Sequence, residues 1–362
     1  MKIVEVRASK LDLPMKKAFG ISRGVQELAQ NVLVEVVLED GTRGLGEGAP
    51  LPPFNGETQE ATLAAIGSID VVGHDARRWR ALADRLAELP SASAACAIET
   101  AALDALARST KTPLHAIFGG AGLELVTDIT ITTGTTAQAS VEAREFAEFR
   151  TLKIKVGGRD VDHDVKRVLA VKAVRPDARI LLDANAGFSL DEALAFIEAL
   201  RQKGALPELF EQPIAGPLGA LAEIRARTGV AIALDESITK ADDVVAANWA
   251  LACDAVNVKI MKSGISRALD IVGAARACGL RTMIGGMVET RLAMGTSASL
   301  AAGLGGFDIV DLDTPLFLAE DPFDGGIAYR GDIIDLAGSD RGHGCALGRS
   351  FRYGFRASEG TA

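Results

Sequence analysis

Residues 152–158 read LKIKVGG, a short apolar strand pattern that carries two lysines and ends in glycine. Similar runs follow along the chain: LLDANAG at 181–187, FEQP at 210–213, ALDES at 233–237 and VNVKIMK at 256–262. Amphipathic helical patterns separate these runs, and the spacing of roughly 24 to 30 residues is typical of βαβ units. From about residue 127 onward we therefore expect an α/β fold in which strands and helices alternate.

The number of such units favours a barrel. We expect strands at residues 128–132, 152–156, 179–182, 209–211, 232–235, 255–260, 281–284 and 309–312. About eight strands in alternation with helices predict a (β/α)-barrel, and an open doubly wound sheet is the alternative. The first strand–helix turn has no GxGxxG pattern, which argues against a dinucleotide-binding form of that sheet.

The first part of the chain has a different character. Residues 31–39 are rich in β-branched side chains and predict a strand, residues 42–58 are dense in glycine and proline and read as a loop, and helical patterns dominate about 59–107. We expect three parts: an α+β domain over residues 1–118, the barrel over 119–325, and a C-terminal tail, 326–362, that packs back on the first domain.

Composition argues for a globular protein that acts on small molecules. Of the 362 residues 48% are hydrophobic and 24% charged, and the net charge is −9, which disfavours nucleic acid or an anionic membrane as a partner. No apolar stretch reaches the roughly 18 residues needed to span a bilayer, and the N-terminus lacks a signal-peptide pattern, so we expect a cytoplasmic location. The four cysteines form no CxxC pair and are expected to be reduced thiols.

Three acids end consecutive predicted strands, where a barrel places its catalytic groups. They are Asp183, Glu211 and Asp235, and neighbouring strands would bring their carboxylates within reach of one cation. Oxygen ligands without histidine or cysteine suit Mg²⁺ or Mn²⁺ better than zinc. Any one of these acids alone could instead cap a helix, but three in register favour a metal site.

Lysines flank this acidic group. Lys153 and Lys155 are two residues apart and point to the same face of their strand, where each ammonium group is expected to lower the pKa of the other and so to yield a base. Lys259 follows four strands later, across the barrel. One lysine on each face of a bound molecule could remove a proton on one side and return it on the other. The alternative is an internal salt-bridge network, which is costly without a function. Lys262 is expected to be a solvated lysine at a helix start.

Taken together, LKIKVGG, LLDANAG, FEQP, ALDES and NVKIMKSGI resemble the muconate-lactonizing-enzyme subgroup of the enolase superfamily. The resemblance covers almost the whole chain and implies a modified (β/α)7β barrel behind an N-terminal α+β capping domain, and a homo-oligomer. It implies these roles: Asp183, Glu211 and Asp235 as Mg²⁺ ligands, Asn185 and Glu236 as supports of the metal site, Lys155 and Lys259 as the acid/base pair, and Lys153 as the residue that tunes Lys155 and helps to hold the substrate carboxylate. The metal would stabilise the enediolate formed when the proton leaves.

The stretch DLDTPLFL at 311–318 looks like the aspartate pair of dipeptide epimerases. Asp311 and Asp313 lie on one face of the eighth strand and could bind the α-ammonium group of a dipeptide. If instead one of them only orients a loop, other reactions of the subgroup remain open: N-acylamino-acid racemisation, o-succinylbenzoate synthesis and muconate-type cycloisomerisation. A non-catalytic binder of small anions is the alternative from another class, and it has no need of opposed bases.

Substrate choice is expected to depend on two capping loops, residues 19–26 and 49–57. Arg23 resembles the loop arginine that meets the glutamate side chain in Ala-Glu epimerases, whereas the apolar residues Phe19, Ile21, Pro53 and Phe54 suit a hydrophobic dipeptide. Met287 and Glu289, in GGMVET, are expected near the substrate. The sequence therefore predicts an isomerase that inverts the α-carbon of the C-terminal residue of a dipeptide, either Ala-Glu from peptidoglycan peptides or a hydrophobic one.

Overall fold

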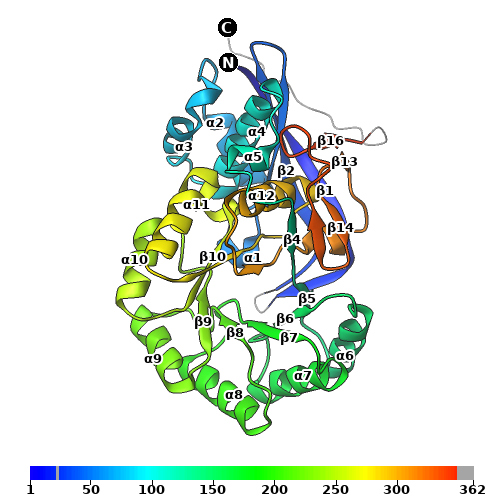
Figure 1. Ribbon diagram of the computed structural model, residues 1–362, viewed down its shortest axis with the longest axis vertical. Helices are drawn as coiled ribbons and strands as arrows, with labels where there is room; N and C mark the ends of the chain where they lie inside the picture. Colours follow the sequence, from blue (N-terminus) through cyan, green and yellow to red (C-terminus); the bar gives the residue numbers. More distant parts are fainter. Residues whose placement is uncertain (22–23, 349–362) are drawn as a thin grey trace.

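The computed structural model describes residues 1–21 and 24–348, and Figure 1 shows its two parts. The N-terminal part is a three-stranded antiparallel sheet, in the order β1-β2-β3, with helices packed against it. Its elements are β1 (Ile3–Ile21), β2 (Gly24–Leu38), β3 (Arg43–Gly48), α1 (Pro52–Asn55), α2 (Gln59–Ser68), η1 (Ala76–Arg78), α3 (Trp79–Leu86), α4 (Ala92–Ser109) and α5 (Leu114–Ile117). The predicted α+β capping unit is confirmed.

Strand β3 corrects the prediction of a loop over residues 42–58. Its glycines lie directly on helix α4: a Cβ atom at Gly44 would sit 2.2 Å from Ala101 O, and one at Gly46 would sit 2.1 Å from Ala97 O. Only glycine permits this approach, because any side chain would overlap the helix backbone. Glycine thus allows the strand and the helix to pack closely, although in the sequence it reads as a loop signal.

The second part is a parallel eight-stranded sheet whose strands follow one another in chain order (Figure 1). The strands are β5 (Ile129–Ile131), β6 (Thr151–Lys155), β7 (Arg179–Asp183), β8 (Leu209–Glu211), β9 (Ala231–Leu234), β10 (Ala255–Val258), β11 (Arg281–Ile284) and β12 (Ile309–Val310). The helices between them are α6 (Thr136–Glu145), α7 (Val161–Val174), α8 (Leu190–Gln202), α9 (Leu218–Thr228), α10 (Ala241–Trp249), α11 (Ile260–Ala277) and α12 (Arg291–Leu304).

This arrangement confirms the modified (β/α)7β barrel. After β12 the described chain forms the short 3-10 turn η2 (Thr314–Phe317) in place of an eighth helix. Asp128, just before β5, donates a backbone hydrogen bond to Val310 O on β12 at 2.9 Å, which joins the first strand to the last. The sequential strand order differs from that of a doubly wound sheet, which reverses direction at its centre.

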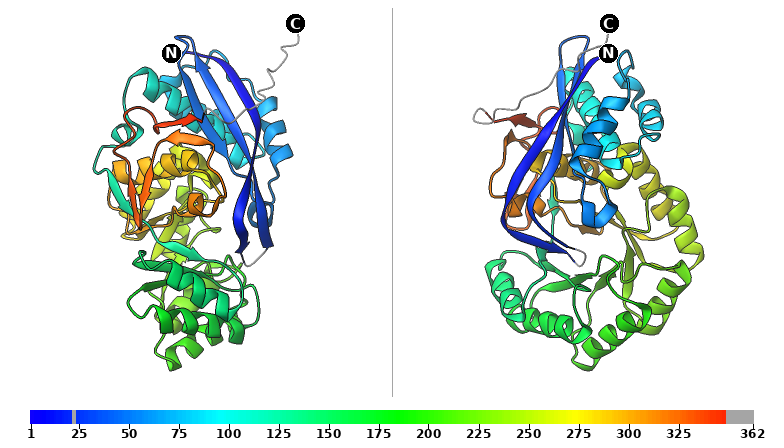
Figure 2. Two further views of the ribbon diagram at one scale, coloured as in Figure 1. Left: turned by 90° about the vertical axis from the view of Figure 1, so that its right-hand side faces the viewer. Right: turned by 180° about the vertical axis from the view of Figure 1, so that it is seen from behind.

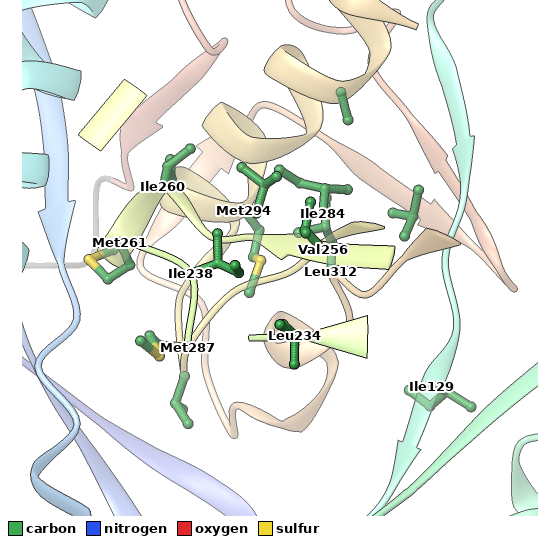
Figure 3. Close-up of a cluster of buried hydrophobic side chains, with 14 of the residues drawn as sticks. Ile129, Leu234, Ile238, Val256, Ile260, Met261, Ile284, Met287, Met294 and Leu312 are labelled. Atoms are coloured by element: carbon green, nitrogen blue, oxygen red, sulfur yellow. The ribbon is translucent and has the colours of Figure 1, made fainter. Parts of the chain in front are cut away.

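Apolar side chains pack on both faces of the barrel sheet, in an outer core against the helices and an inner core within the barrel. Figure 3 shows part of the outer one, in which Leu234, Val256 and Ile284 from the strands lie near Ile260 and Met294 from the helices. The inner one fills the barrel and consists of Leu181, Leu209, Ala233, Ala255, Met283 and Ile309. Because side chains alternate along a strand, the next inward-facing residues lie at the C-terminal mouth of the barrel, and they include Asp183, Glu211, Asp235 and Asp311.

The segment after the barrel connects the two parts. Strand β13 (Phe323–Gly325) pairs with β16 (Cys345–Leu347), and β14 (Ala328–Arg330) and β15 (Ile333–Asp335) form a sheet with β4 (Glu124–Val126). His343 N donates to Asp104 Oδ1 of α4 at 3.0 Å, and Arg108 donates to Cys345 O at 2.5 Å. These contacts with α4 support our proposal that the tail completes the capping domain. Residues 349–362 lie outside the described part.

The capping sheet also reaches the barrel mouth. The long β1–β2 hairpin runs down beside the barrel (Figure 2), where Lys16 Nζ donates to Leu316 O at 2.9 Å. On β2, Asn31 Nδ2 donates to Val288 O at 2.8 Å, and Glu47 on β3 accepts a bond from the Thr290 hydroxyl at 2.5 Å.

Among the described helices, none is both long and apolar enough to cross a bilayer.

Candidate active site

A pocket opens at the C-terminal ends of the strands, beneath the capping unit. It is lined by Leu51, Phe54, Thr130, Lys153, Lys155, Asn185, Lys259, Gly286, Met287, Val288, Asp311, Asp313 and Thr314. The structure thus brings together both proposed acid/base lysines, the third lysine, the aspartate pair and Met287. Leu51 and Phe54, at the start and within α1, come from the capping unit, so both parts of the chain build the pocket.

Lys155 is held by two polar side chains from the end of β7. Its Nζ donates to Asp183 Oδ2 at 2.6 Å and to Asn185 Oδ1 at 3.1 Å. Asn185 has a backbone φ of 43°, in the left-handed region that asparagine tolerates better than most residues. Its amide also donates to Glu236 Oε1 at 3.4 Å, so the two expected supports lie side by side next to Lys155.

Lys153 is paired differently from our expectation. Its ammonium group donates to Asp311 Oδ2 and lies 3.7 Å from Asp183 Oδ2. Burial opposes its charge, but Asp311, Glu211 and Asp183 outweigh burial and hold the pKa of Lys153 well above the usual value. The expectation that paired ammonium groups lower each other's pKa is therefore wrong for Lys153, because it counted the neighbouring lysine and left out the acids.

Lys259 faces the pocket from the other side, immediately after β10. Its Nζ lies 2.7 Å from Asp235 Oδ2 and 4.9 Å from the centroid of the Phe54 ring, a cation–π distance. Burial disfavours the charge, yet Asp235 and Glu211 raise the pKa of Lys259 above its ordinary value. The sheet order places β6 and β10 four strands apart, so Lys155 and Lys259 approach the pocket from different sides.

Lys262 is not the solvated lysine that we expected. Its side chain is only 7% exposed, and its Nζ donates to Asp235 Oδ1 at 2.6 Å and to Asn257 O at 3.2 Å. Lys259 is the N-cap of α11, so Lys262 lies one turn later on the same side of the helix and points back to the mouth. Asp235 is therefore bound by two lysines.

The three acids proposed as metal ligands are all buried at the mouth. Asp183 pairs in register with Glu211 across β7 and β8, and Asp235 follows β9. Burial and the charges of Asp183 and Asp235 raise the pKa of Glu211 to about 8. Glu211 Oε1 accepts a bond from Asn257 Nδ2 at 2.6 Å, whereas the buried Oε2 has no hydrogen-bond partner among the residues that the structure describes. A buried carboxylate oxygen without a described partner, on the strand between those that carry or precede the other two acids, is a ligand that suits a hard divalent cation.

Asp128 is a residue that sequence reasoning missed, and it joins the predicted aspartate pair. In the described chain, Asp128, Asp311 and Asp313 form the set of three acids whose carboxylate oxygens all lie within 4.8 Å of one another. Asp313 Oδ2 accepts a bond from Thr130 N at 2.6 Å, and burial together with Asp311 raises the pKa of Asp313 to about 6. Asp128 begins DITIT, where its alternation with Thr130 is the signal that places it on the inner face.

Gln212 is a second residue that sequence reasoning missed. Its side-chain oxygen accepts a bond from Asp235 N at 3.0 Å, and its side-chain nitrogen donates to Ser237 Oγ at 2.8 Å. Its φ of 34° is also left-handed. A strained residue directly after Glu211 thus braces the loop that carries Asp235.

Of the expected specificity residues, Met287 lines the pocket and Glu289 lies behind it. Glu289 is fully buried, and its Oε1 accepts a bond from Met287 N at 2.6 Å. Burial and, to a lesser degree, Glu47 raise the pKa of Glu289 to about 8. Arg23 lies outside the described residues, as do the side chains of Phe19, Ile21 and Pro53.

The antiparallel cap, the (β/α)7β barrel and the lysine- and acid-lined mouth define a protein of the enolase superfamily. Residues 3–119 match the N-terminal domain of mandelate racemase and muconate lactonizing enzyme, and residues 135–349 match the enolase C-terminal domain-like family. The chain belongs to this mandelate racemase and muconate lactonizing enzyme family.

Proteins that are similar in sequence or in structure indicate the type of enzyme within this family. The chain is 44% identical to an aromatic dipeptide epimerase of Herpetosiphon aurantiacus, over 95% of this chain and 99% of that protein. It is 37% identical to an L-Ala-D/L-Glu epimerase of Thermotoga maritima, over 90% and 95%. It also resembles a dipeptide epimerase of Enterococcus faecalis solved with Mg and L-Leu-L-Tyr, with a TM-score of 0.89, 30% identity and coverage of 96% and 100%. These relatives place the chain among the isomerases of its family.

Proposed function

We propose that the chain is a Mg²⁺-dependent dipeptide epimerase that inverts the α-carbon of the C-terminal residue of its substrate. The observation that carries this proposal is the placement of Lys155 and Lys259 on opposite sides of one pocket that also contains Asp311 and Asp313. Two opposed lysines suit proton exchange at one carbon, and two acids suit a substrate with a free ammonium group.

In this proposal Asp183, Glu211 and Asp235 hold the cation, and Mn²⁺ is an alternative to Mg²⁺. A bound cation would supply positive charge against the substrate carboxylate, on which negative charge grows as the α-proton leaves. The similarity to a dipeptide epimerase solved with Mg supports the assignment, and so does the unpartnered Oε2 of Glu211.

The lysines move the proton. One of them, neutral, takes the α-proton from its own side of the substrate, and the other, protonated, delivers a proton to the opposite side. Exchange of these roles runs the reaction in the reverse direction, so the same pair converts either epimer. Asn185 keeps Lys155 aimed at the pocket, and the Phe54 ring does the same for Lys259.

The dipeptide's amino terminus is assigned to Asp311 and Asp313. An N-acylated amino acid or a muconate has no cation to offer these carboxylates, so the racemase and lyase reactions are disfavoured. Lys153, paired with Asp311, balances part of the acidic charge and stands between this subsite and Asp183.

A hydrophobic dipeptide, with an aromatic residue foremost, is the substrate class that we favour. Apart from the charged groups, the pocket wall is mainly apolar and includes Leu51, Phe54, Met287 and Val288. In the described lining, the lysines are the cations, and each is already paired with an acid. The similarity to an aromatic dipeptide epimerase points the same way. Ala-Glu is the second candidate, and it depends on Arg23.

The test is incubation of the Mg²⁺-loaded protein with a dipeptide library in D₂O, followed by mass spectrometry. Epimerisation replaces the α-hydrogen with solvent deuterium, so we expect a gain of one mass unit, strongest for dipeptides with aromatic or large aliphatic C-terminal residues. Preferential labelling of Ala-Glu would refute the hydrophobic preference. If no dipeptide is labelled while metal binding is demonstrated, the epimerase proposal fails, and N-acylamino acids and lyase substrates are tested next.

A further inference from the structure

Asp128 is a buried acid in a part of the barrel that is otherwise apolar. It precedes β5 and is 2% exposed. Thr130, two residues later, lines the pocket, so Asp128 lies one layer deeper on the same inner face. On the other strands the interior below the pocket is filled by apolar residues such as Leu181, Met283 and Ile309. A carboxyl group in such a place needs a partner.

The surroundings of Asp128 offer acids rather than donors. Neither of its carboxyl oxygens accepts a hydrogen bond from the described residues, and Asp311 and Asp313, which follow β12, each have a carboxylate oxygen within 4.8 Å of one of its oxygens. The neighbouring cation, Lys153 of β6, donates its hydrogen bond to Asp311. Arg179, at the start of β7, donates to Glu208 at 2.7 Å. Three buried carboxyl groups therefore share one ammonium group.

Three charges cannot coexist there, so one acid must hold a proton. Asp311 accepts a hydrogen bond from Lys153, and Asp313 accepts one from the backbone N–H of Thr130 at 2.6 Å. Asp128 has no comparable support. Burial and the charge of Asp311 raise the pKa of Asp128 well above its usual range. The proton is therefore expected on Asp128, whose hydroxyl has the neighbouring carboxylates as acceptors.

We propose that Asp128 is a positioning residue of the ammonium subsite: as a neutral acid it donates a hydrogen bond to Asp311 and orients that carboxylate toward the substrate's amino terminus. This inference rests on the proposed dipeptide epimerase function. It also determines the charge of the subsite. With Asp128 neutral, Asp311, Asp313 and Lys153 sum to one negative charge, which a single substrate ammonium group neutralises. With Asp128 ionised, one uncompensated charge would remain.

The test compares two replacements that branch at the same atom. D128N keeps a neutral donor, whereas D128L removes it. We expect D128L to raise KM for a dipeptide roughly tenfold or more, the loss typical of a hydrogen bond to a charged group, with a smaller effect on kcat. D128N should stay within about threefold of the wild type. The control substrate is the des-amino analogue of the dipeptide, which lacks the ammonium group. The rate of its slow α-deuterium exchange should be equal in D128L and in the wild type.

A spectroscopic measurement makes the inference independent of activity and of the folding of D128L. Infrared difference spectra between wild type and D128N at neutral pH should contain the carbonyl stretch of a protonated carboxylic acid. If only carboxylate bands differ, or if D128N loses as much activity as D128L, the inference is wrong. A second Mg²⁺ per chain that disappears in D128N would also overturn it, since the three acids would then form a cation site. A wild type inactive on all dipeptides would instead refute the proposed function.

Discussion

Replacement of one lysine at a time should separate the two halves of proton exchange. Lys155 is held by Asp183 and Asn185 at 2.6 and 3.1 Å, whereas Lys259 contacts Asp235 at 2.7 Å and the Phe54 ring. Because the two lysines share none of these partners, removal of one leaves the surroundings of the other intact. Each variant should therefore lose one face of the reaction only.

The expected loss follows from the role of a general base. A general base typically raises the reaction rate roughly 10²- to 10⁴-fold, which corresponds to a lowering of the activation free energy by about 2.7 to 5.4 kcal/mol. K155A and K259A should therefore each lose epimerisation by at least about a hundredfold. Each should still exchange the α-proton of one epimer with solvent, and the two variants should exchange opposite epimers.

The assay is proton NMR of both dipeptide epimers in D₂O, in which loss of the α-proton signal is followed separately from inversion. K166A is a suitable control, because Lys166 is 62% exposed and pairs with Asp162 on the surface of α7; it should behave as the wild type. If K155A and K259A exchange the same epimer, or if either still epimerises at the wild-type rate, the assignment of one lysine to each face is refuted.

Three further outcomes are expected. F54A should lower kcat/KM for aromatic dipeptides relative to alanine dipeptides by roughly tenfold to a hundredfold, since burial of an aromatic ring contributes about 1.5–3 kcal/mol. If competition assays give the same ratio of the two kcat/KM values in F54A and in the wild type, Phe54 does not determine specificity. Chelation by EDTA should abolish deuterium exchange, and Mg²⁺ or Mn²⁺ should restore it, as followed by the same mass measurement. D104N should destabilise the fold by about 3–5 kcal/mol in urea titrations, because it leaves His343 buried without its charge partner. Burial opposes the charge of His343, but Asp104 raises the pKa of His343 from 6.5 to about 10. The pair therefore stabilises the wild type fully below about pH 6.5, and its contribution falls as the pH rises toward 10. If the urea midpoint has the same pH dependence in D104N and in the wild type, this reasoning is wrong.

Much of the fold could be predicted because many of the barrel strands are apolar stretches with charged residues at or just after their C-terminal ends. The predicted strand at 179–182 and the observed β7, Arg179–Asp183, differ by one residue, and the other strands are similarly close. The (β/α)7β form came from the resemblance to a family. Strand β3 could not be predicted in this way, because its glycines are explained by the contact with α4, and local patterns do not reveal contacts between distant segments.

The site was predicted less completely than the fold. Strand ends identified the residues that face the mouth, and the pocket gathers Lys153, Lys155 and Lys259 as expected. The pairing of these groups was not predictable, because it depends on which side chains meet across the barrel. Lys262 and Asp128 illustrate the difficulty. In the sequence Lys262 resembles an ordinary helix-start residue and Asp128 the first residue of a strand, and each becomes informative only once its buried neighbours are known.

The contact between Glu47 and Thr290 has a consequence for attempts to exchange capping units between relatives. Glu47 is 1% exposed and accepts bonds from Asn31 of its own sheet at 2.7 Å and from Thr290 of the barrel at 2.5 Å. A transplanted cap that lacks this acid would leave the backbone N–H groups at the start of α12 without their acceptor, and a barrel that lacks the threonine would deprive the buried carboxylate of its hydroxyl donor. Chimeric proteins that inherit both residues from one parent should therefore accept a new cap, and with it a new set of pocket-lining loops, more readily than those that divide the pair.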